Sequence, residues 1–406
     1  MRVLLIIDWN RGRGGAEAYA AWLRDGLRAA GDEVLLLTSS AGTAGDGAAE
    51  YVAYGTEQVV AQTLLQIVNP FAAQTVRRAV REFRPDVVWV NMFAHHLSPA
   101  VLLAMGDVPT VLFVSDYKVI CPLGSKLLPD GRLCESTAGR VCYQSGCLSF
   151  PHWVRDQARY ALIRSALRRV DRVIACSEWV RRSLQQEGVR SEVEAVPAPA
   201  AAPGFIRKPA QEPTFLYFGR LAPEKGVSLL IRAFRRLSQQ FPSARLMVVG
   251  EGAERASLEA LAATSGLSGA VEFLGWLSPE QLDEPLSRAW AAVVPSLWAE
   301  PHGLVAVEAI VRGTPVICSA SGGLGEIVED GVSGLKFPNN DEEALLHCLR
   351  QVASGEAFPE RAVSAEVVSK VQARYDMAVH IGRIQRILRE SAQATKGGAI
   401  ATSSRS

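Results

Sequence analysis

The sequence has almost no net charge and no long apolar run. Its 406 residues include 43 Lys and Arg against 42 Asp and Glu, which gives a formal net charge of +1. Without an overall positive field, the chain is not expected to bind nucleic acid. No apolar stretch approaches the roughly 18 residues of a membrane span, and the apolar run at residues 3–7 ends at Asp8, too early for a signal peptide. We therefore predict a cytosolic protein.

Cysteine is also scarce, with 7 residues in the chain. In a long chain without a signal peptide, this predicts reduced thiols and not a disulfide framework. Two alternatives stay open for an insertion at about residues 121–150: a structural zinc site, completed by a fourth thiol or by His152, or buried and redox-labile thiols. The cysteines concerned are Cys121, Cys134, Cys142 and Cys147.

Short runs of β-branched and apolar residues are abundant, and helical patterns separate them. Such runs predict buried strands of parallel sheets that have helices on both faces, which is the α/β class. The length of the chain favours two domains. The expected strands lie at residues 3–7, 34–38, 87–90, 110–114 and 173–176, and then at 214–218, 246–249, 271–274, 292–295 and 316–318.

An Ala/Pro/Gly-rich stretch at residues 197–204 interrupts this pattern and indicates a linker. We predict an N-terminal Rossmann-like domain at residues 1–203 and a second at residues 204–391, whose last helix, at about residues 365–391, packs back on the first. A disordered tail would follow at residues 392–406. Two such sheets that face each other would bind a ligand in a cleft between them, at the carboxyl ends of their strands.

Residues that suit a phosphate follow the first strand of each half. Gly14 and Gly15 open a helix, whose first N–H groups can bind phosphate, although a simple tight turn explains them equally well. They do not complete a dinucleotide fingerprint, because the third glycine is missing. In the second half, Arg220 and Lys225 lie on one loop and could neutralise a diphosphate, or form a solvated ion pair.

A second cluster lies around residues 300–308. Glu300 precedes a predicted helix start at Gly303, and Glu308 lies about a turn and a half inside that helix. Carboxylates accept hydrogen bonds from paired hydroxyls, so the two could hold a sugar and a ribose. For Glu308, the alternative is a carboxylate that the helix dipole favours.

Taken together, these motifs resemble the family 4 retaining glycosyltransferases of the GT-B fold. The resemblance covers nearly the whole chain and rests on the order and spacing of five motifs. They are Gly-Gly-Ala-Glu at 14–17, Phe-Gly-Arg-Leu at 218–221, Glu-Lys-Gly at 224–226, Val-Val-Gly-Glu-Gly at 248–252, and Glu300 and Glu308 with Gly-Leu at 303–304.

The resemblance implies a role for each of these residues. Arg220 and Lys225 would grip the diphosphate of a UDP- or GDP-sugar without a metal, Glu300 would hold the donor sugar, and Glu308 would bind the ribose. It also implies a hydroxyl acceptor and retention of anomeric configuration, in the assembly of a cell-surface glycan or exopolysaccharide. Backbone contacts to sugar and phosphate would come from Gly14, Gly15, Gly303, Leu304 and Val305.

One position departs from the family pattern. Ser115 stands where relatives carry a His near the donor sugar, and a Ser cannot carry a positive charge. Asp116 then becomes the expected polar contact to sugar or acceptor, unless it only caps a turn. His95 is a further contact candidate, or else a loop histidine that the backbone satisfies. The departure keeps open a nucleotide-sugar-binding protein with weak or lost transfer; a nucleotide-sugar epimerase or a phosphorylase-like enzyme is a further alternative.

Arginines are interleaved with apolar residues in the stretch from Trp153 to Arg182. The six that form the predicted basic face are Arg155, Arg159, Arg164, Arg168, Arg169 and Arg172. A basic amphipathic helix there could lie on the inner face of the cell membrane and bring a lipid-linked glycan acceptor to the enzyme. Alternatively, its apolar stripe packs on the sheet and its arginines are solvated.

Overall fold

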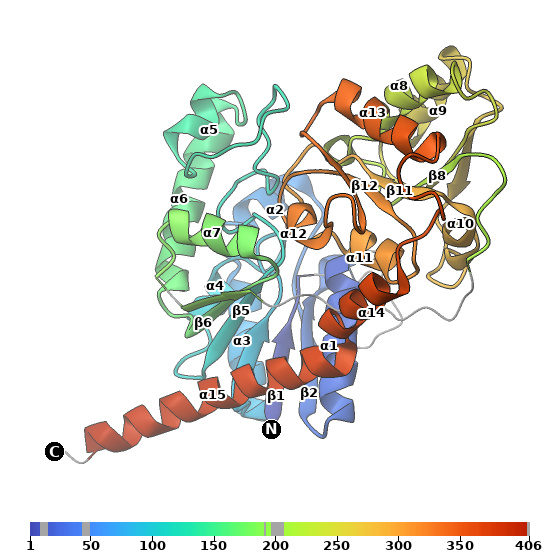
Figure 1. Cartoon of the computed structure of the whole chain (residues 1–406). Helices are drawn as coiled ribbons and strands as arrows, with labels where there is room; N and C mark the ends of the chain where they lie inside the picture. The colour runs from blue at the N-terminus through green and yellow to red at the C-terminus, as the bar shows by residue number, and fades with distance from the viewer. Residues whose placement is uncertain (9–14, 43–48, 191, 196–206, 404–406) are drawn as a thin grey trace. The chain divides into compact units, whose positions relative to one another are not determined.

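The computed structural model describes residues 1–8, 15–42, 49–190, 192–195 and 207–403 (Figure 1). Contacts divide the chain into two units. The first unit comprises Met1–Gly124, Glu135–Ala198 and Met377–Ser406, and the second comprises Ser125–Cys134 and Pro199–Asp376. Each unit is built on a parallel sheet, so the predicted α/β class is confirmed.

The first unit contains a seven-stranded sheet in the order β3-β2-β1-β4-β5-β6-β7. Every neighbouring pair is parallel, and the inner strands are almost wholly buried, as apolar runs of this kind require. Its strands are β1 (Arg2–Ile6), β2 (Glu33–Ser39), β3 (Tyr51–Ala53), β4 (Val87–Val90), β5 (Thr110–Val114), β6 (Arg172–Ala175) and β7 (Glu192–Ala195).

Helices cover this sheet and fill its connections. Some begin at side-chain caps that the sequence provides: Ser177 accepts a hydrogen bond from the backbone of Val180, and Asn69 accepts one from Ala72. The helices are α1 (Gly15–Ala29), α2 (Val59–Leu65), α3 (Pro70–Phe83), α4 (Ala100–Leu103), α5 (Arg140–Gln144), α6 (Phe150–Leu167), α7 (Glu178–Gln186) and α15 (Met377–Ser403), with a short 3-10 turn, Ser40–Gly42.

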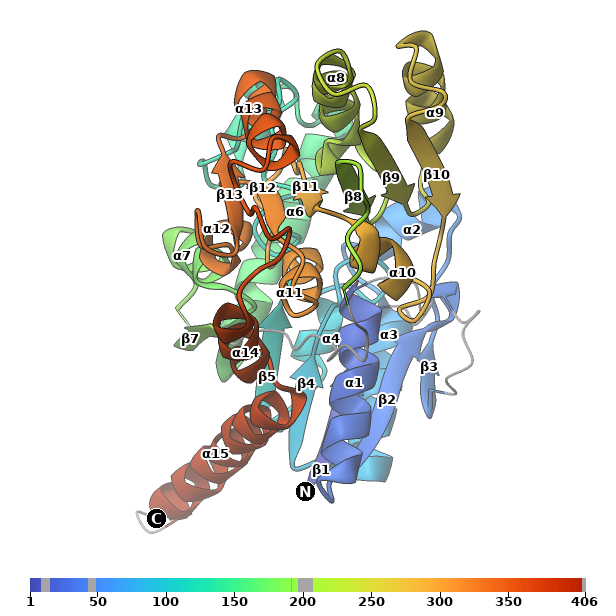
Figure 2. The ribbon, with the colours of Figure 1, turned by 45° about the vertical axis from the view of Figure 1, so that its right-hand side comes forward.

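The second unit contains a six-stranded parallel sheet in the order β10-β9-β8-β11-β12-β13 (Figure 2). One apolar core lies under α8, α9 and α13, and another lies under α10, α11, α12 and α14. The strands are β8 (Thr214–Phe218), β9 (Arg245–Val249), β10 (Val271–Gly275), β11 (Ala291–Val294), β12 (Val316–Ser319) and β13 (Gly334–Phe337). The helices are α8 (Val227–Ser238), α9 (Arg255–Thr264), α10 (Asp283–Arg288), α11 (Leu304–Ile310), α12 (Leu324–Ile327), α13 (Glu342–Ala353) and α14 (Ala365–Arg374), with a 3-10 turn, Pro223–Lys225.

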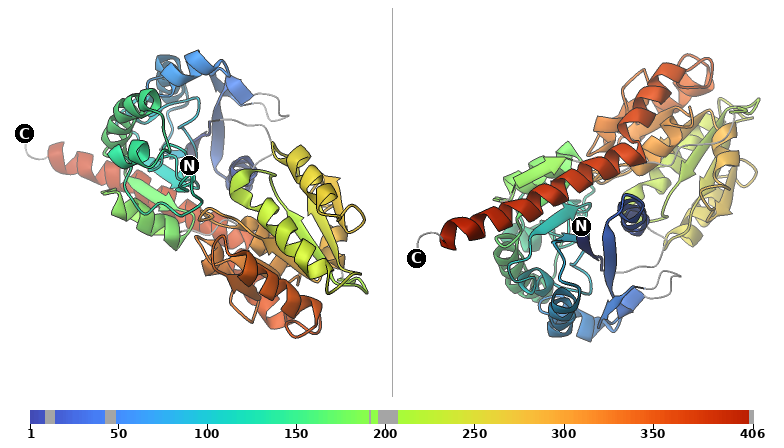
Figure 3. Two further views of the ribbon diagram at one scale, coloured as in Figure 1. Left: turned by 90° about the horizontal axis from the view of Figure 1, so that it is seen from above. Right: turned by 90° about the horizontal axis from the view of Figure 1, so that it is seen from below.

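The single helix expected at about residues 365–391 is two helices, α14 and α15, and α15 continues to Ser403. Helix α15 packs on α1, β4 and β5 within the first unit, where Figure 3 shows it running past the sheet. Its side chains are bonded to three parts of that unit: His380 to Tyr19, Gln385 to Asp32, and Glu390 to Arg172. No helix in the described part of the chain is long and apolar enough to cross a membrane.

The strand order reverses between β1 and β4 in the first sheet, and between β8 and β11 in the second. Open α/β sheets bind ligands at such points, beyond the carboxyl ends of the strands. The loops that follow these strands therefore carry the candidate site residues of each unit.

Candidate functional site

In the second unit, the structure brings Lys225 and Glu300 together, from the loops after β8 and β11. The Lys225 Nζ lies 2.6 Å from the Glu300 Oε1, and the Ser296 hydroxyl donates to the same oxygen at 2.7 Å. Glu300 is only 7% exposed. Burial raises the pKa of this carboxyl, but the Lys225 charge and the hydrogen bonds outweigh it, so the pKa lies below its usual value. Glu300 is therefore an ionised hydrogen-bond acceptor.

Arg220 lies on the same loop in a different environment. Its side chain is 62% exposed and forms an ion pair with Glu224 at 2.6 Å. Its backbone is held by the Tyr217 hydroxyl, which donates to the Arg220 carbonyl at 2.7 Å. A solvent-exposed ion pair contributes little to stability, so Arg220 can exchange Glu224 for a ligand phosphate at small cost.

Glycines let the site loops of the second unit approach each other. A Cβ at Gly226 would lie 2.1 Å from the Pro295 carbonyl oxygen, and one at Gly250 would lie 1.9 Å from that of Gly219. Both glycines also have positive φ angles, +69° and +137°. Only glycine fits these positions, so the loops after β8, β9 and β11 are held in one compact group.

Gly303, at φ +107°, precedes α11, and Leu304 and Val305 are its first residues. Glu308, in the second turn of α11, is half-buried, and its carboxylate has no hydrogen-bond or ion-pair partner among the described residues. Burial raises the pKa of Glu308, and the nearby Arg312 charge opposes this. A buried carboxylate without a partner destabilises a fold, which is typical of a group kept for a ligand.

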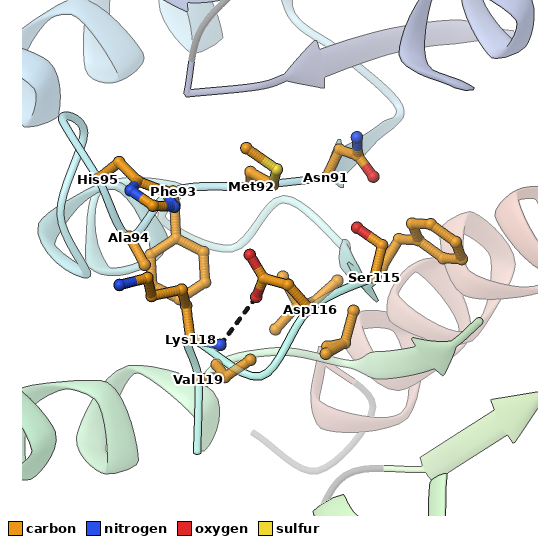
Figure 4. Close-up of a pocket in the computed structure, with 12 residues that line it drawn as sticks. Asn91, Met92, Phe93, Ala94, His95, Ser115, Asp116, Lys118 and Val119 are labelled. Atoms are coloured by element: carbon orange, nitrogen blue, oxygen red, sulfur yellow. Dashed lines mark hydrogen bonds between the residues drawn. The ribbon is translucent and has the colours of Figure 1, made fainter. Parts of the chain in front are cut away.

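In the first unit, a pocket of about 300 Å³, open to solvent, lies beyond the carboxyl ends of β4 and β5. Figure 4 shows the carboxylate of Asp116 directed into the space between the two strand-end loops. The three predicted contacts, His95, Ser115 and Asp116, all line this pocket. Its other polar lining residues are Asn91 and Lys118.

Asp8 organises this pocket, and sequence reasoning missed it. It is fully buried after β1, and its carboxylate accepts hydrogen bonds from the backbone N–H groups of His95, His96 and Leu97. The bonds to His96 and Leu97 are both 2.8 Å long. The available signal was an Asp placed directly after an apolar strand at the switch point.

Asp116 combines both predicted roles. Its Oδ1 accepts the Lys118 N–H at 2.8 Å, which caps a turn, while its side chain also lines the pocket. Burial raises the pKa of Asp116, although the Lys118 charge opposes it. Burial likewise lowers the pKa of Lys118, which Arg159 lowers further by repulsion. The pocket therefore holds a carboxyl and an amine whose charged forms are both disfavoured.

His95 is a neutral imidazole in this setting. Burial lowers its pKa from 6.5 to about 4; the Asp8 charge opposes that shift, and the charges of Lys118 and Arg159 add to it. A neutral imidazole can exchange hydrogen bonds with a sugar hydroxyl, but it does not supply the cation that Ser115 also lacks.

Half of the predicted basic face on α6 and beyond is not available to a membrane. Arg159 is 2% exposed and donates to the Ala94 carbonyl below the pocket. Arg155 forms an ion pair with Asp156, and Arg172 forms one with Glu390. These three arginines are therefore neither free for a membrane nor solvated as the packing alternative expected. Of the six, the exposed cations that remain are Arg164, Arg168 and Arg169.

The surroundings of the four cysteines in the insertion bear on the zinc alternative. Among the described residues, which include all four cysteines of the insertion, no group of three or more His, Cys, Asp or Glu side chains is placed to hold a metal ion. Cys142 is buried on α5, whereas the partly exposed Cys121, Cys134 and Cys147 lie on loops. Of the two alternatives for these cysteines, the structure gives no support to the zinc site, which stays a prediction.

Of the two glycines predicted to approach the diphosphate from the first unit, Gly14 lies outside the described residues. Gly15 is the exposed first residue of α1, close in sequence to the end of β1. Its position on a helix start agrees with the expected local structure.

Comparisons with known proteins agree with the motifs. Residues 202–366 match the family model "Glycosyl transferases group 1", and residues 14–199 match "Glycosyl transferase 4-like domain". Glycogen synthase of Mycobacterium tuberculosis is 32% identical over 299 residues, which cover 70% of this chain. The chain spans 64% of the length of that relative.

Solved structures share the fold. Sucrose-phosphate synthase from Thermosynechococcus elongatus has a TM-score of 0.75 and 24% identity, with 96% of this chain and 100% of that chain covered. HepE of Anabaena in complex with UDP-glucose has a TM-score of 0.68 and 20% identity, with 96% and 100% covered. These similarities confirm the predicted two-domain α/β fold of the GT-B glycosyltransferases.

Proposed function

We propose that this chain, which belongs to the group 1 glycosyltransferases, transfers a sugar from a nucleotide-diphosphate sugar to a hydroxyl acceptor. The observation that carries the proposal is the Lys225–Glu300 pair beside the exposed Arg220, at the switch point of the second sheet. These residues supply two cations and an ionised acceptor where such a sheet binds ligands.

Each of these groups has a chemical task in the transfer. Arg220 and Lys225 would neutralise the diphosphate as it leaves, and that stabilisation of developing charge is commonly the largest catalytic contribution. Because the cations are part of the chain, we propose transfer without a metal. Glu300 would accept hydrogen bonds from sugar hydroxyls, while Ser296 and Lys225 hold it in place. Glu308 would bind the ribose, and retention of configuration follows the family pattern.

The donor that we propose is a UDP- or GDP-sugar. The UDP-glucose complex of HepE, which shares the fold, supports the UDP alternative. Backbone contacts to sugar and phosphate would come from Gly303, Leu304 and Val305 at the start of α11, and from Gly15 in the first unit.

For the acceptor we propose a glycan or lipid-linked glycan in polysaccharide assembly, bound at the pocket of His95, Ser115 and Asp116. The pocket is small and has polar lining residues, as a sugar hydroxyl requires. Peripheral contact with an anionic membrane belongs to this proposal, and on α6 and the turn after it Arg164, Arg168 and Arg169 are the exposed cations for it.

A thermal-shift and calorimetric screen against UDP, GDP, ADP, TDP and CMP tests the donor assignment. A nucleotide that binds the folded chain raises its melting temperature in proportion to affinity. We expect one nucleoside diphosphate to stabilise the wild type, to stabilise Arg220→Ala less, and to stabilise the control Arg235→Ala, which removes an exposed arginine of α8, as much as the wild type. No response to any nucleotide would contradict the proposal.

Ser115 favours a second candidate, a nucleotide-sugar-binding protein with weak or lost transfer. It predicts the same nucleotide binding without product formation from any acceptor. Interconversion of the nucleotide sugar without an acceptor would identify an epimerase instead. Product analysis with the donor that the screen selects separates these outcomes.

A further inference from the structure

Exposed apolar side chains are concentrated in one part of the first unit. Among the described residues, sixteen large hydrophobic side chains are exposed, and seven of them lie between residues 52 and 71. The other nine are spread over the rest of the chain. We name the seven the apolar patch: Val52, Tyr54, Val59, Val60, Leu64, Val68 and Phe71.

Helix α2 forms the centre of the apolar patch. None of its residues is buried, and residues 59–68 contain no charged side chain. Val59 and Val60 are each 76% exposed, and Leu64 is 64% exposed. An apolar helix without a buried residue is unusual, and contiguous apolar exposure of this kind marks an interaction site.

Helix α3 adds exposed positive charge next to the apolar patch. Its inner face, from Ala72 to Phe83, is buried, whereas Phe71 is exposed in its first turn. The exposed side chains that follow include four cations and one carboxylate, Glu82. The cations are Arg77, Arg78, Arg81 and Arg84. In Figure 3, both helices lie at the rim of the first unit.

We propose that the apolar patch docks the first unit on an anionic lipid bilayer. Valine, leucine and aromatic side chains would enter the boundary between head groups and acyl chains, and the arginines of α3 would contact anionic head groups. Charge complementarity selects this occupant. A second copy would bring the same four cations to the interface, whereas the bilayer supplies the opposite charge.

The apolar patch is connected to the pocket of the first unit through Asn69, which is fully buried between α2 and α3. The Asn69 Nδ2 donates to the Tyr54 carbonyl at 2.8 Å and to the His96 carbonyl at 2.7 Å, and the Asn69 N–H donates to the Ser98 hydroxyl at 2.8 Å. A bilayer on the patch would thus lie beside the segment after His95. This placement suits a lipid-linked acceptor, and that part of the inference rests on the proposed function.

Co-sedimentation of the full chain with vesicles tests the docking. We expect it to bind vesicles of phosphatidylcholine with phosphatidylglycerol, and to bind phosphatidylcholine alone at least about tenfold more weakly. Val60→Ser with Leu64→Ser should weaken binding to the anionic vesicles about tenfold, because two apolar side chains leave the interface. Arg77→Gln with Arg81→Gln should remove most of the preference for phosphatidylglycerol. All four side chains are exposed outside the core, and circular dichroism checks the fold.

The matched control is Val332→Ser with Val379→Ser, two exposed valines that lie outside α2, α3 and α6, which should leave vesicle binding unchanged. The proposal is overturned if the wild type binds neither vesicle, if the α2 variant binds as the wild type does, or if only the control variant loses binding. It is also overturned if the α2 variant dissociates a dimer, since a second copy then covers the patch. Nucleotide binding is measured without vesicles, so failure of the donor proposal is recorded separately.

Discussion

The two sheets share the strand order around their switch points, but the charged side chains in their loops have different partners. In the second unit, the cations lie beside carboxylates: Lys225 pairs with Glu300 and Arg220 with Glu224. In the first unit, the Asp8 carboxylate accepts hydrogen bonds from backbone N–H groups, and burial raises the pKa of Asp116 and lowers the pKa of Lys118 in the pocket. The same topology can therefore surround its switch point with exposed and paired charges or with partly buried polar groups, and the loops decide which.

The largest effect should come from breaking the ionic site. In Lys225→Ala, loss of the cation should lower turnover by about 100-fold or more, measured with saturating donor. Glu300 would remain buried without its partner, so the variant should also unfold more easily. Lys370→Ala, which removes an exposed lysine of α14, is the control and should change neither quantity.

A double variant separates these two consequences of losing Lys225. Lys225→Met with Glu300→Gln removes both charges, so thermal stability should return toward that of the wild type while turnover stays low. Wild-type turnover in Lys225→Ala would remove this residue from the mechanism.

Glu308→Gln sharpens the comparison inside the second unit, because this carboxylate, unlike Glu300, has no partner among the described residues. We expect the affinity for the nucleoside diphosphate to fall about tenfold by calorimetry, since a ribose hydroxyl loses a charged acceptor.

The same variant should make the folded protein more stable at neutral pH, whereas it weakens nucleotide binding. The pKa of Glu308 is raised above 4.5 in the folded protein, so the folded state holds this proton more tightly than the unfolded state does. The wild type therefore loses stability as the pH rises from about 4.5 through the raised pKa, and Glu308→Gln should not show this loss. Unchanged nucleotide affinity would refute the ribose assignment.

Asp116→Asn tests whether the pocket of the first unit acts independently of the nucleotide. The side-chain amide oxygen of this variant can still accept the Lys118 N–H, so the turn should persist. We expect transfer to fall about fivefold, while nucleotide affinity stays within about twofold of the wild type. An equal loss of nucleotide affinity would mean that the pocket belongs to the donor and not to the acceptor.

The smallest effect concerns the attachment of α15 to the first unit. Burial lowers the pKa of His380 from 6.5 to about 4, with Arg383 acting in the same direction, and its Nε2 lies 3.1 Å from the Tyr19 hydroxyl. The unfolded chain therefore binds a proton that the folded chain does not, so stability is lost as the pH falls from 6.5 toward 4. His380→Gln should reduce this loss by on the order of 1 kcal/mol. Identical pH profiles of unfolding would contradict the assignment.

The sequence predicted site residues best where they follow directly after a predicted strand. Lys225 and Glu300 follow strands that the apolar pattern locates, so their placement at one switch point was predictable. Prediction failed for the arginines of α6: Arg159 points inward to the Ala94 carbonyl, and nothing in the spacing of basic residues distinguishes it from the exposed Arg164.

The sequence by itself determined the α/β class, the two-domain organisation and the family, because apolar runs and glycine-dependent loops are local properties of the chain. Only the tertiary structure decided which charged groups lie next to one another and how deeply each is buried. Only the folded first unit brings Asp8 to the backbone after His95, places Lys118 near Arg159, and leaves α2 without a buried residue. The energy of a charge depends on its neighbours and on its burial, and both are set by contacts between residues far apart in the sequence.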